Sequence, residues 1–526
     1  MHNTDRGHDL AGDLYCGVDV GTQGSKAGLY DVAGRCVGEG YAEHHFDNLR
    51  PGWVEMDPEQ IVAATVTAIA TAVAHSGVDG HRVRAIALSG ILCGPVFVDD
   101  DWNPVRPLIP YLDVRASDEV AWLANEVEPR WVTESANAAL DTYVMPAVYE
   151  WVRRHDPGAH ARIRKVLSLA PFVGGRLAGL RAAQAYTDPS HLSGWIIGWN
   201  ASTGRPSEQQ MADLGIPVEH APQVHAPWDI VGELTRTMAE RTGLAPGTPI
   251  AAGAGDVMQS NLGAGLTRPG MATDVAGTAS ILTVGVTEPN PAITAVPGML
   301  YSLSTLPGQA LYWGYVKAGG MSLRWMRDEV LGRLGDDSLY VQGDRAAAHV
   351  PPGSGGVLFA PYLSGGNPDN PDASGLWLGM SMDTDLGVLW RSMLESIAFE
   401  YADFLDVFAA NGAGVAEVIA VGGGARSPLW NQIKADVVGM PWRVPTRQDG
   451  AVLANAALAA LAVGAIDDLA GTVSAWVQAG EAHVPDAATH ALYRRVRTAR
   501  TDLLAGPLRQ VFSTLAPLRT LASPQE

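Results

Sequence analysis

The chain has 526 residues, of which 47% are hydrophobic and 17% are charged, and its formal net charge at pH 7 is -20. So long a chain exceeds what one hydrophobic core can organise, and at least two domains are expected. The negative balance argues against nucleic acid or an anionic membrane as a partner, because both require concentrated positive charge. The three cysteines lack disulfide or metal-site spacing, and neither a signal peptide nor a transmembrane stretch is present, which favours a cytoplasmic protein.

The first predicted elements form an antiparallel meander, because apolar residues alternate with small or polar ones. Its strands are residues 14–21, a second strand through Lys26 to Tyr30, and residues 36–45. A helix is predicted over 58–76, since Asp57 is placed to cap it and Pro58 suits its first position. Gln60 fits a capping box, and Gly77 ends the helix.

A buried strand is predicted at 83–89, followed by helices around 119–127 and 147–154. This β-β-β-α-β-α order is typical of a ribonuclease-H-like unit. The scheme repeats after a glycine-rich junction that begins near Thr248. Its predicted elements are strands near 271–287, 296–304 and 311–317, a helix at 385–410 and a strand at 417–422.

One phrase occurs in both halves of the chain, as Asp19-Val20-Gly21-Thr22 and as Asp274-Val275-Ala276-Gly277-Thr278. Each copy lies between two predicted strands. A Gly-Thr turn exposes backbone N–H groups beside a hydroxyl, which is the chemistry of a phosphate cradle. Two such turns on duplicated halves predict a nucleotide held from both sides of a cleft.

Four motifs, in order, resemble those of the FGGY carbohydrate kinases. They are DVGTQGSK at 19–26, GAGD at 253–256, AGTAS at 276–280 and VGGGARSPLWNQIKADVVGMP at 421–441. The resemblance implies two ribonuclease-H-like (actin-like ATPase) α/β domains with a cleft between them. It implies an N-terminal FGGY domain over 13–262 for sugar and phosphate, and a C-terminal FGGY domain over 263–505 for the nucleotide. ATP and Mg²⁺ are the implied cofactors.

The resemblance also implies roles for the nucleotide-binding residues. Asp19 would hold Mg²⁺ through water, and the Gly422–Gly424 backbone would carry adenosine, with Asn431 facing adenine. The other nucleotide candidates are Gly21, Thr22, Gln23, Gly277 and Thr278. Taken alone, Asp19 could merely bond its own turn. The absence of a GxxxxGK[ST] motif excludes a P-loop mechanism.

Asp256 is the predicted catalytic residue. In the resemblance it orients a sugar hydroxyl and accepts its proton as the oxygen attacks the γ-phosphate. Taken alone, Asp256 could instead cap a helix beginning at Val257. His44 and His45 are interpreted as a solvated strand pair, and no His or Cys cluster has metal-ligand spacing.

The predicted sugar pocket departs from the family pattern. After the strand at 83–89, the chain has neither the Gln-Met-His-Gly stretch of xylulokinases nor the Arg-Glu pair of glycerol kinases. The predicted substrate contacts are Leu92, Cys93, Asp113, Tyr143 and Asp256. Apolar side chains cannot hydrogen-bond to a buried hydroxyl, so the substrate should differ from xylulose where it meets Leu92 and Cys93.

The sequence therefore predicts an ATP-dependent, Mg²⁺-requiring kinase of a small sugar. A ketopentose is the first choice, as in xylulokinases, and a polyol of the glycerol or erythritol type is the second. A non-catalytic sugar sensor and a chaperone-like ATPase are alternatives from other classes. The sensor would be expected to lack Asp256, and the ATPase would need a peptide-binding domain for which the chain has no spare length. A homodimer is the candidate assembly.

Overall fold

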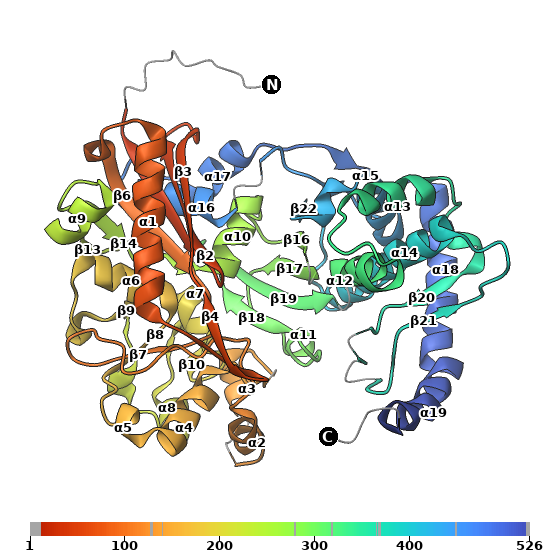
Figure 1. The fold of residues 1–526 in the computed structure, drawn as a ribbon, viewed down its shortest axis with the longest axis horizontal. Helices are drawn as coiled ribbons and strands as arrows, with labels where there is room; N and C mark the ends of the chain where they lie inside the picture. Colours follow the sequence, from red (N-terminus) through yellow and green to blue (C-terminus); the bar gives the residue numbers. More distant parts are fainter. Residues whose placement is uncertain are drawn as a thin grey trace.

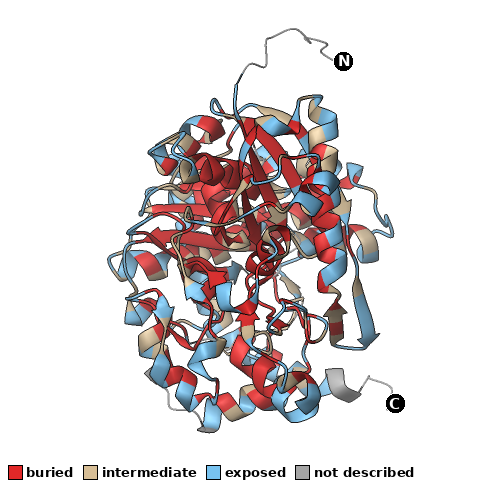
Figure 2. Cartoon of the chain, turned by 90° about the vertical axis from the view of Figure 1, so that its left-hand side faces the viewer, coloured by how far each residue is buried: buried red, intermediate tan, exposed pale blue. Residues whose placement is uncertain are grey.

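Two α/β domains, each built on a mixed β-sheet, lie side by side (Figure 1). The computed structural model describes residues 12–126, 130–138, 140–277, 280–316, 319–363, 365–366, 370–447 and 450–521. Buried residues gather in the strands at the centre, and exposed residues lie on the outer helices and loops (Figure 2). The predicted fold class of two α/β domains is confirmed.

Among the described residues, the first sheet has the strand order β13-β14-β6-β1-β2-β3, with β15 also paired to β6. Its strands are β1 (Leu14–Val20), β2 (Gly24–Asp31), β3 (Cys36–Glu43), β6 (Val83–Gly90), β13 (Ile230–Glu233), β14 (Pro249–Ala251) and β15 (Ala254–Gly255). β1 runs antiparallel to β2 and parallel to β6, which places Asp19 opposite Ser89. The predicted meander is confirmed, and the ends of β1 and β6 meet at one edge of the sheet.

Helix α1 (Pro58–Ser76) has the bounds that the sequence predicts. The Asp57 side chain accepts the Glu59 N–H at 2.9 Å, and Gly77 ends the helix in the left-handed conformation, with φ of 65°. α1 packs on β2 and β3. Gly38 and Gly40 on β3 permit this approach, because a Cβ at either position would overlap with the α1 backbone.

The chain between β3 and β13 forms short strand pairs and helices besides β6. The strand pairs are β4 (Phe46–Arg50) with β5 (Trp53–Met56), β7 (Val96–Val98) with β8 (Lys165–Leu167), β9 (Tyr186–Thr187) with β12 (Gln223–Val224), and β10 (Trp199–Asn200) with β11 (Arg205–Pro206). The helices are α2 (Ser117–Glu126), α3 (Arg130–Ser135), α4 (Met145–His155), α5 (Pro157–His160), α6 (Leu169–Ala178), α7 (Pro189–Ser193) and α8 (Glu208–Asp213). α2 and α4 correspond to the two helices predicted in this region.

The second sheet repeats the plan of the first. Its order in the described part of the chain is β18-β19-β17-β16-β22-β23-β24. Its strands are β16 (Met271–Ala276), β17 (Ser280–Val286), β18 (Leu300–Leu303), β19 (Ala310–Val316), β22 (Glu417–Val421), β23 (Trp442–Arg443) and β24 (Ala482–His483). β16 runs antiparallel to β17 and parallel to β22, as β1 does to β2 and β6. The two copies of the repeated phrase therefore occupy equivalent hairpins.

Helices cover both faces of the second sheet and continue to the C-terminus. They are α10 (Asp256–Ala264) before the sheet, then α11 (Pro291–Thr294), α12 (Gly319–Trp325), α13 (Ser338–Ala348), α14 (Leu386–Ala410), α15 (Pro428–Val438), α17 (Leu469–Val477), α18 (Ala487–Ala505) and α19 (Pro507–Leu521), with the hairpin β20 (Leu358–Ala360) and β21 (Leu376–Leu378). Helix α9 (Arg236–Thr242) packs instead on α1 of the first domain. α14 matches the predicted long helix. No helix within the described ranges is long and apolar enough to cross a bilayer.

Helix α16 (Ala451–Ala462) comes late in the chain but packs on β1 and β6 of the first sheet. Its alanine-rich sequence lets the helix approach closely, and Gly17 on β1 lies directly beneath it. Asn455 on α16 donates to the Val18 carbonyl at 2.7 Å. The second half of the sequence therefore supplies part of the core of the first domain.

The packing of α16 predicts a strong effect of Gly17→Ala. The new Cβ would overlap with the Val452 carbonyl, which belongs to the backbone and cannot rotate away. We expect a loss of about 3 kcal/mol in the free energy of unfolding, at the upper end for overpacking, measured by urea denaturation. Gly414→Ala is the control, because no atom lies within 4 Å of its Cβ position. Equal stability of the two variants would contradict the close packing of α16.

Candidate active site

The first phosphate turn, residues 21–24, connects β1 to β2 and is closed by a hydrogen bond from its first N–H to its last carbonyl at 3.1 Å. Asp19 stands just before the turn, and its Oδ1 accepts the Ser89 hydroxyl at 2.8 Å. Asn455 donates to the same Ser89 oxygen at 2.8 Å. Burial raises the pKa of the Asp19 carboxyl. Elements from both halves of the chain thus hold this carboxylate at the edge of the sheet.

His44 supports the same turn from behind. Its Nε2 donates to the Gly21 carbonyl at 3.0 Å, and its backbone N–H donates to the Gln23 carbonyl at 3.3 Å. Only 4% of His44 is exposed, and burial is the main cause that lowers its pKa. The prediction of a solvated His44-His45 pair is therefore wrong for His44, because the chain after β3 folds back over the turn. The hydroxyl of Thr22, in the turn, lies 3.3 Å from the Tyr111 hydroxyl, measured between oxygens.

Asp256 is the first residue of α10, and Gly255 is the N-cap. The alternative prediction of Asp256 as a cap for a helix beginning at Val257 is therefore wrong. Burial and the nearby charge of Asp19 raise the pKa of Asp256 to about 7. The Ser190 hydroxyl accepts the Gly255 N–H at 2.9 Å and fixes the start of α10. The charge of Asp19 therefore disfavours the ionised form of Asp256.

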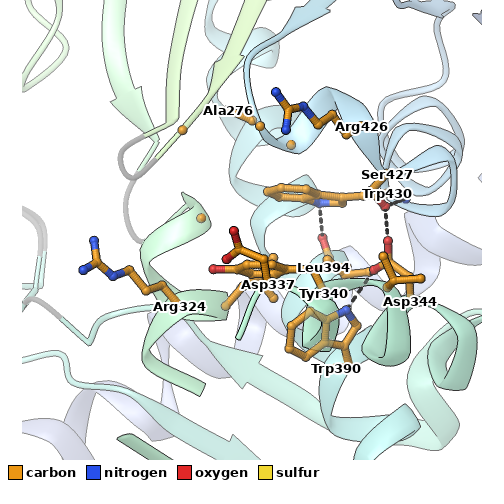
Figure 3. A pocket seen from close by; sticks show the side chains of 16 residues that line it. Ala276, Arg324, Asp337, Tyr340, Asp344, Trp390, Leu394, Arg426, Ser427 and Trp430 are labelled. Atoms are coloured by element: carbon orange, nitrogen blue, oxygen red, sulfur yellow. Dashed lines mark hydrogen bonds between the residues drawn. The ribbon is translucent and has the colours of Figure 1, made fainter. Parts of the chain in front are cut away.

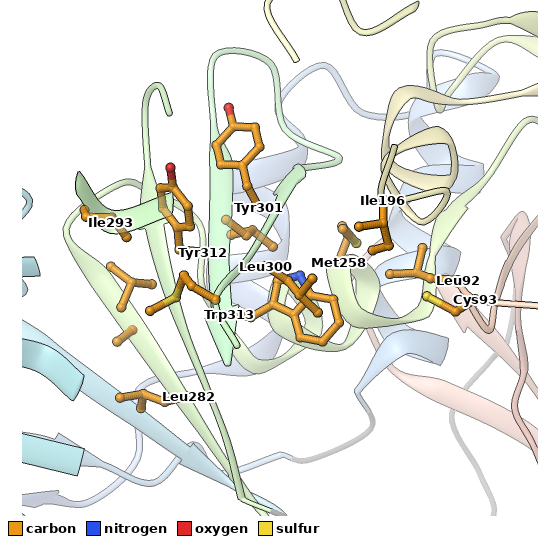
Figure 4. Close-up of a cluster of buried hydrophobic side chains, with 14 of the residues drawn as sticks. Leu92, Cys93, Ile196, Met258, Leu282, Ile293, Leu300, Tyr301, Tyr312 and Trp313 are labelled. Atoms are coloured by element: carbon orange, nitrogen blue, oxygen red, sulfur yellow. The ribbon is translucent and has the colours of Figure 1, made fainter. Parts of the chain in front are cut away.

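Leu92 and Cys93 follow β6 and line the region beside Asp256. Both are buried, at one end of a hydrophobic cluster beside Ile196 and Met258 (Figure 4). The Cys93 thiol donates to the Gly194 carbonyl at 3.5 Å. Burial raises the pKa of this thiol to about 12, and the charges of Asp256 and Asp141 contribute to the rise. Cys93 therefore remains a neutral, largely apolar group close to two carboxylates.

Asp141, Tyr143 and Tyr315 surround the same region. Burial raises the pKa of both tyrosines, and the charge of Asp141 raises each further. The Asp141 Oδ1 accepts the Thr142 N–H at 2.7 Å, and its Oδ2 has no hydrogen-bond partner among the described residues. Sequence reasoning missed Asp141 and Tyr315 as site residues. Asp141 lies two residues before Tyr143 in the sequence, but only the fold brings β19, and with it Tyr315, to this place.

Asp113 has a structural role that the sequence did not predict. Its side chain is buried and forms an ion pair with Arg115, with an Nη2–Oδ2 distance of 2.8 Å. Oδ2 also accepts the Val54 N–H at 2.6 Å. Both oxygens are already engaged, so the predicted contact with substrate is corrected: the carboxylate braces the loop that carries Tyr111.

The second domain holds a cavity of about 480 Å³ at the ends of β16 and β22. Its glycine wall includes Gly277, Gly423 and Gly424, and Trp430 forms one side (Figure 3). A Cβ at Gly424 would overlap with Trp430 and Ala276. Gly422, just before, has φ of 82°, a conformation that favours glycine. The predicted glycine run therefore forms bare backbone along a cavity of nucleotide size.

Asn431 does not line this cavity. It is 1% exposed, and its Nδ2 donates to the Ala425 carbonyl at 2.8 Å. Its Oδ1 has no hydrogen-bond partner among the described residues, and its contact with adenine stays a prediction. Ser427 and Asp344 line the cavity instead. Thr278, predicted with Gly277 as the second phosphate turn, lies outside the described residues.

Asp274, the counterpart of Asp19 in the repeated phrase, is fully buried in an ion pair with Lys434. The Tyr401 hydroxyl donates to its Oδ1 at 2.6 Å. The Lys434 ammonium lies 3.9 Å from the ring centre of Trp430, behind the cavity wall. The two copies of the phrase thus place an aspartate on equivalent strands but in different environments.

Two family models match the chain. The N-terminal domain model of the FGGY family of carbohydrate kinases matches residues 14–263, and the C-terminal domain model matches residues 272–463. The two models together span most of the chain.

Relatives and solved structures agree with these matches. A xylulose kinase of Lactococcus lactis is 26% identical over 485 residues, covering 91% of this chain and 94% of that protein. A glycerol kinase of Leptothrix cholodnii is 28% identical over 476 residues, covering 87% and 92%. The crystal structure of a xylulose kinase from Rhodospirillum rubrum superposes with a TM-score of 0.84 at 28% identity, covering 96% of this chain and 99% of that one.

The glycine wall predicts the effect of Gly423→Val. Gly423 has φ of -61° and its Cβ position is 3.8 Å from the nearest atom, the Ala276 carbonyl oxygen, so the variant should fold. Its branched side chain would enter the cavity, and we expect nucleotide affinity to fall by at least about tenfold. Calorimetry with ADP and a thermal unfolding curve test both points. A folded variant with unchanged ADP affinity would place the nucleotide elsewhere.

Proposed function

The chain belongs to the FGGY family of carbohydrate kinases, and we propose that it transfers the γ-phosphate of ATP to a hydroxyl of a ketopentose. The domain models and the xylulose kinase relatives support this choice. A polyol of the glycerol or erythritol type is the second candidate, favoured by the glycerol kinase relative. Membership of the family makes the protein a phosphotransferase, which removes the sensor and the chaperone-like ATPase from consideration.

The observation that carries the proposed mechanism is the pair of carboxylates, Asp256 and Asp19, beside the first phosphate turn. A pKa of about 7 suits Asp256 as a base at neutral pH. Asp256 orients the sugar hydroxyl and receives its proton late, as the oxygen attacks the γ-phosphate. The bare backbone of residues 21–24 and of the glycine wall receives the phosphates and adenosine.

Asp19 is the proposed Mg²⁺ residue, acting through water. Its Oδ1 is engaged by Ser89, while its Oδ2 has no hydrogen-bond partner in the described ranges, and carboxylate oxygen suits a hard cation. The ion, when bound, neutralises charge on the phosphoryl group during transfer. No cluster of three or more His, Cys, Asp or Glu that could bind a metal occurs in the described part of the chain.

The pocket chemistry supports an uncharged substrate. The charges of Asp256 and Asp141 both raise the pKa of the Cys93 thiol, so two carboxylates lie close to this region. An anionic sugar would meet repulsion from these carboxylates. The Asp141 Oδ2 and the two tyrosine hydroxyls can hydrogen-bond to sugar hydroxyls, whereas Leu92 and Cys93 favour a less polar segment.

Three further parts of the proposal rest on the sequence. The protein is cytoplasmic, in keeping with three cysteines that form no disulfide. It forms a homodimer. The two domains divide between residues 262 and 263, with α16 returning to the first domain.

The base assignment predicts a large loss in Asp256→Asn. Turnover should fall by roughly two to four orders of magnitude, while ADP affinity measured by calorimetry stays within a few-fold. In the wild type, the carboxyl is protonated below its pKa, so kcat/KM should fall by about tenfold per pH unit below pH 7. The residual activity of the variant should not show this decline of kcat/KM below pH 7. Near-normal turnover of Asp256→Asn would sink the assignment.

The pocket predicts the outcome of a substrate screen with ADP release as the readout. D-xylulose and glycerol should be poor relative to the true substrate, and aldonates poorer still. Cys93→Ser, nearly identical in size, should raise kcat/KM for D-xylulose relative to the preferred sugar. The serine hydroxyl can hydrogen-bond to the xylulose hydroxyl that Cys93 leaves without a partner. If D-xylulose exceeds every other sugar tested, the pocket argument fails and the kinase assignment stands.

A further inference from the structure

Asp344, on α13, places a carboxylate in the cavity of the second domain. The Trp390 Nε1 donates to its Oδ1 at 2.9 Å, and the Ser427 hydroxyl donates to its Oδ2 at 2.6 Å. Ser427 in turn accepts the Trp430 N–H at 3.0 Å, so the direction of its hydroxyl hydrogen is fixed toward Asp344. Figure 3 shows this group on the side of the cavity opposite Arg324.

The Asp344 carboxylate is held by neutral donors alone. It forms no ion pair with any residue in the described ranges, and burial raises its pKa. A half-buried carboxylate needs hydrogen-bond donors to offset its desolvation. Each of its oxygens has one protein donor and at least one more lone pair. This part of the cavity can therefore accept hydrogen bonds and favours a ligand that donates them.

The position of Asp344 indicates which part of a nucleotide it meets. Gly277, which directly follows β16 and belongs to the second phrase predicted to bind phosphate, lines the end of the cavity that we assign to the phosphates. Asp344 lies instead beside Ser427, which begins α15 after the glycine wall. A base lying on Gly423 and against Trp430 would present its edge to this carboxylate. The ribose and phosphates would extend toward the other end.

We propose that Asp344 accepts a hydrogen bond from the exocyclic amine of the nucleobase and thereby selects adenine over a purine that carries a carbonyl at that position. Adenine offers the amine as a donor, whereas hypoxanthine offers an oxygen that the carboxylate repels. Trp390 and Ser427 keep the carboxylate in place. The inference rests on the proposed nucleotide site but not on the identity of the sugar.

Calorimetry with ADP and IDP tests the inference without sugar or turnover. IDP should bind the wild-type protein about 10- to 100-fold more weakly than ADP, as expected for the loss of a hydrogen bond to a charged group. Asp344→Asn supplies an N–H donor to the IDP carbonyl, so the ratio of the two dissociation constants should shrink by about tenfold or more. Asp337→Asn is the matched control, because Asp337 lines the same cavity but is exposed, and it should leave the ratio unchanged.

Several outcomes would overturn the inference. Equal affinity of the wild type for ADP and IDP would refute base selection while leaving the nucleotide site intact. An unchanged ratio in a folded Asp344→Asn variant would show that another group reads the base. If Asp344→Asn instead removes a preference for ADP over 2′-deoxy-ADP, the carboxylate holds the ribose. Failure of the wild type to bind ADP at all would remove both the inference and the proposed nucleotide site.

Discussion

The burial of two neighbouring carboxylates is the constraint on which the arrangement of the first domain depends. Burial raises the cost of ionising both Asp19 and Asp256, and the charge of Asp19 raises that cost further for Asp256. Hydrogen-bond donors offset part of this cost. Ser89 donates to Asp19, and the Val257 N–H donates to Asp256. The result is a carboxyl with a pKa of about 7 near the bare backbone of residues 21–24.

The two halves of the chain use one structural plan for different tasks. In the first copy of the repeated phrase, Asp19 stands at the open edge of the sheet with one oxygen available. In the second copy, Asp274 is neutralised by Lys434 and fully buried. The same Lys434 lies under the ring of Trp430, a wall of the cavity. One aspartate is thus available for chemistry, and its counterpart stabilises the wall against which the nucleotide is proposed to lie.

The pocket beside Asp256 combines apolar and acidic groups. Leu92 packs over Gly255, where a Cβ would overlap with it, and Cys93 stays protonated because of burial and nearby charge. The polar capacity comes from Asp141 and the tyrosines rather than from Asp113, whose oxygens are consumed by Arg115 and a backbone N–H. The side chains around Asp256 thus come from several loops and from a strand of the second sheet.

Local interactions could be read from the sequence alone. The limits of α1 follow from Asp57, Pro58 and Gly77, which act within one turn of the helix ends, and the turn at residues 21–24 follows from a short glycine-containing phrase. What the sequence could not determine depends on contacts between residues far apart in the chain. The burial of His44 over the turn, the pairing of Asp113 with Arg115 against Val54, and the packing of α16 on β1 are of this kind. A side chain's availability is decided by which partners the fold brings to it, and residue type does not record those partners.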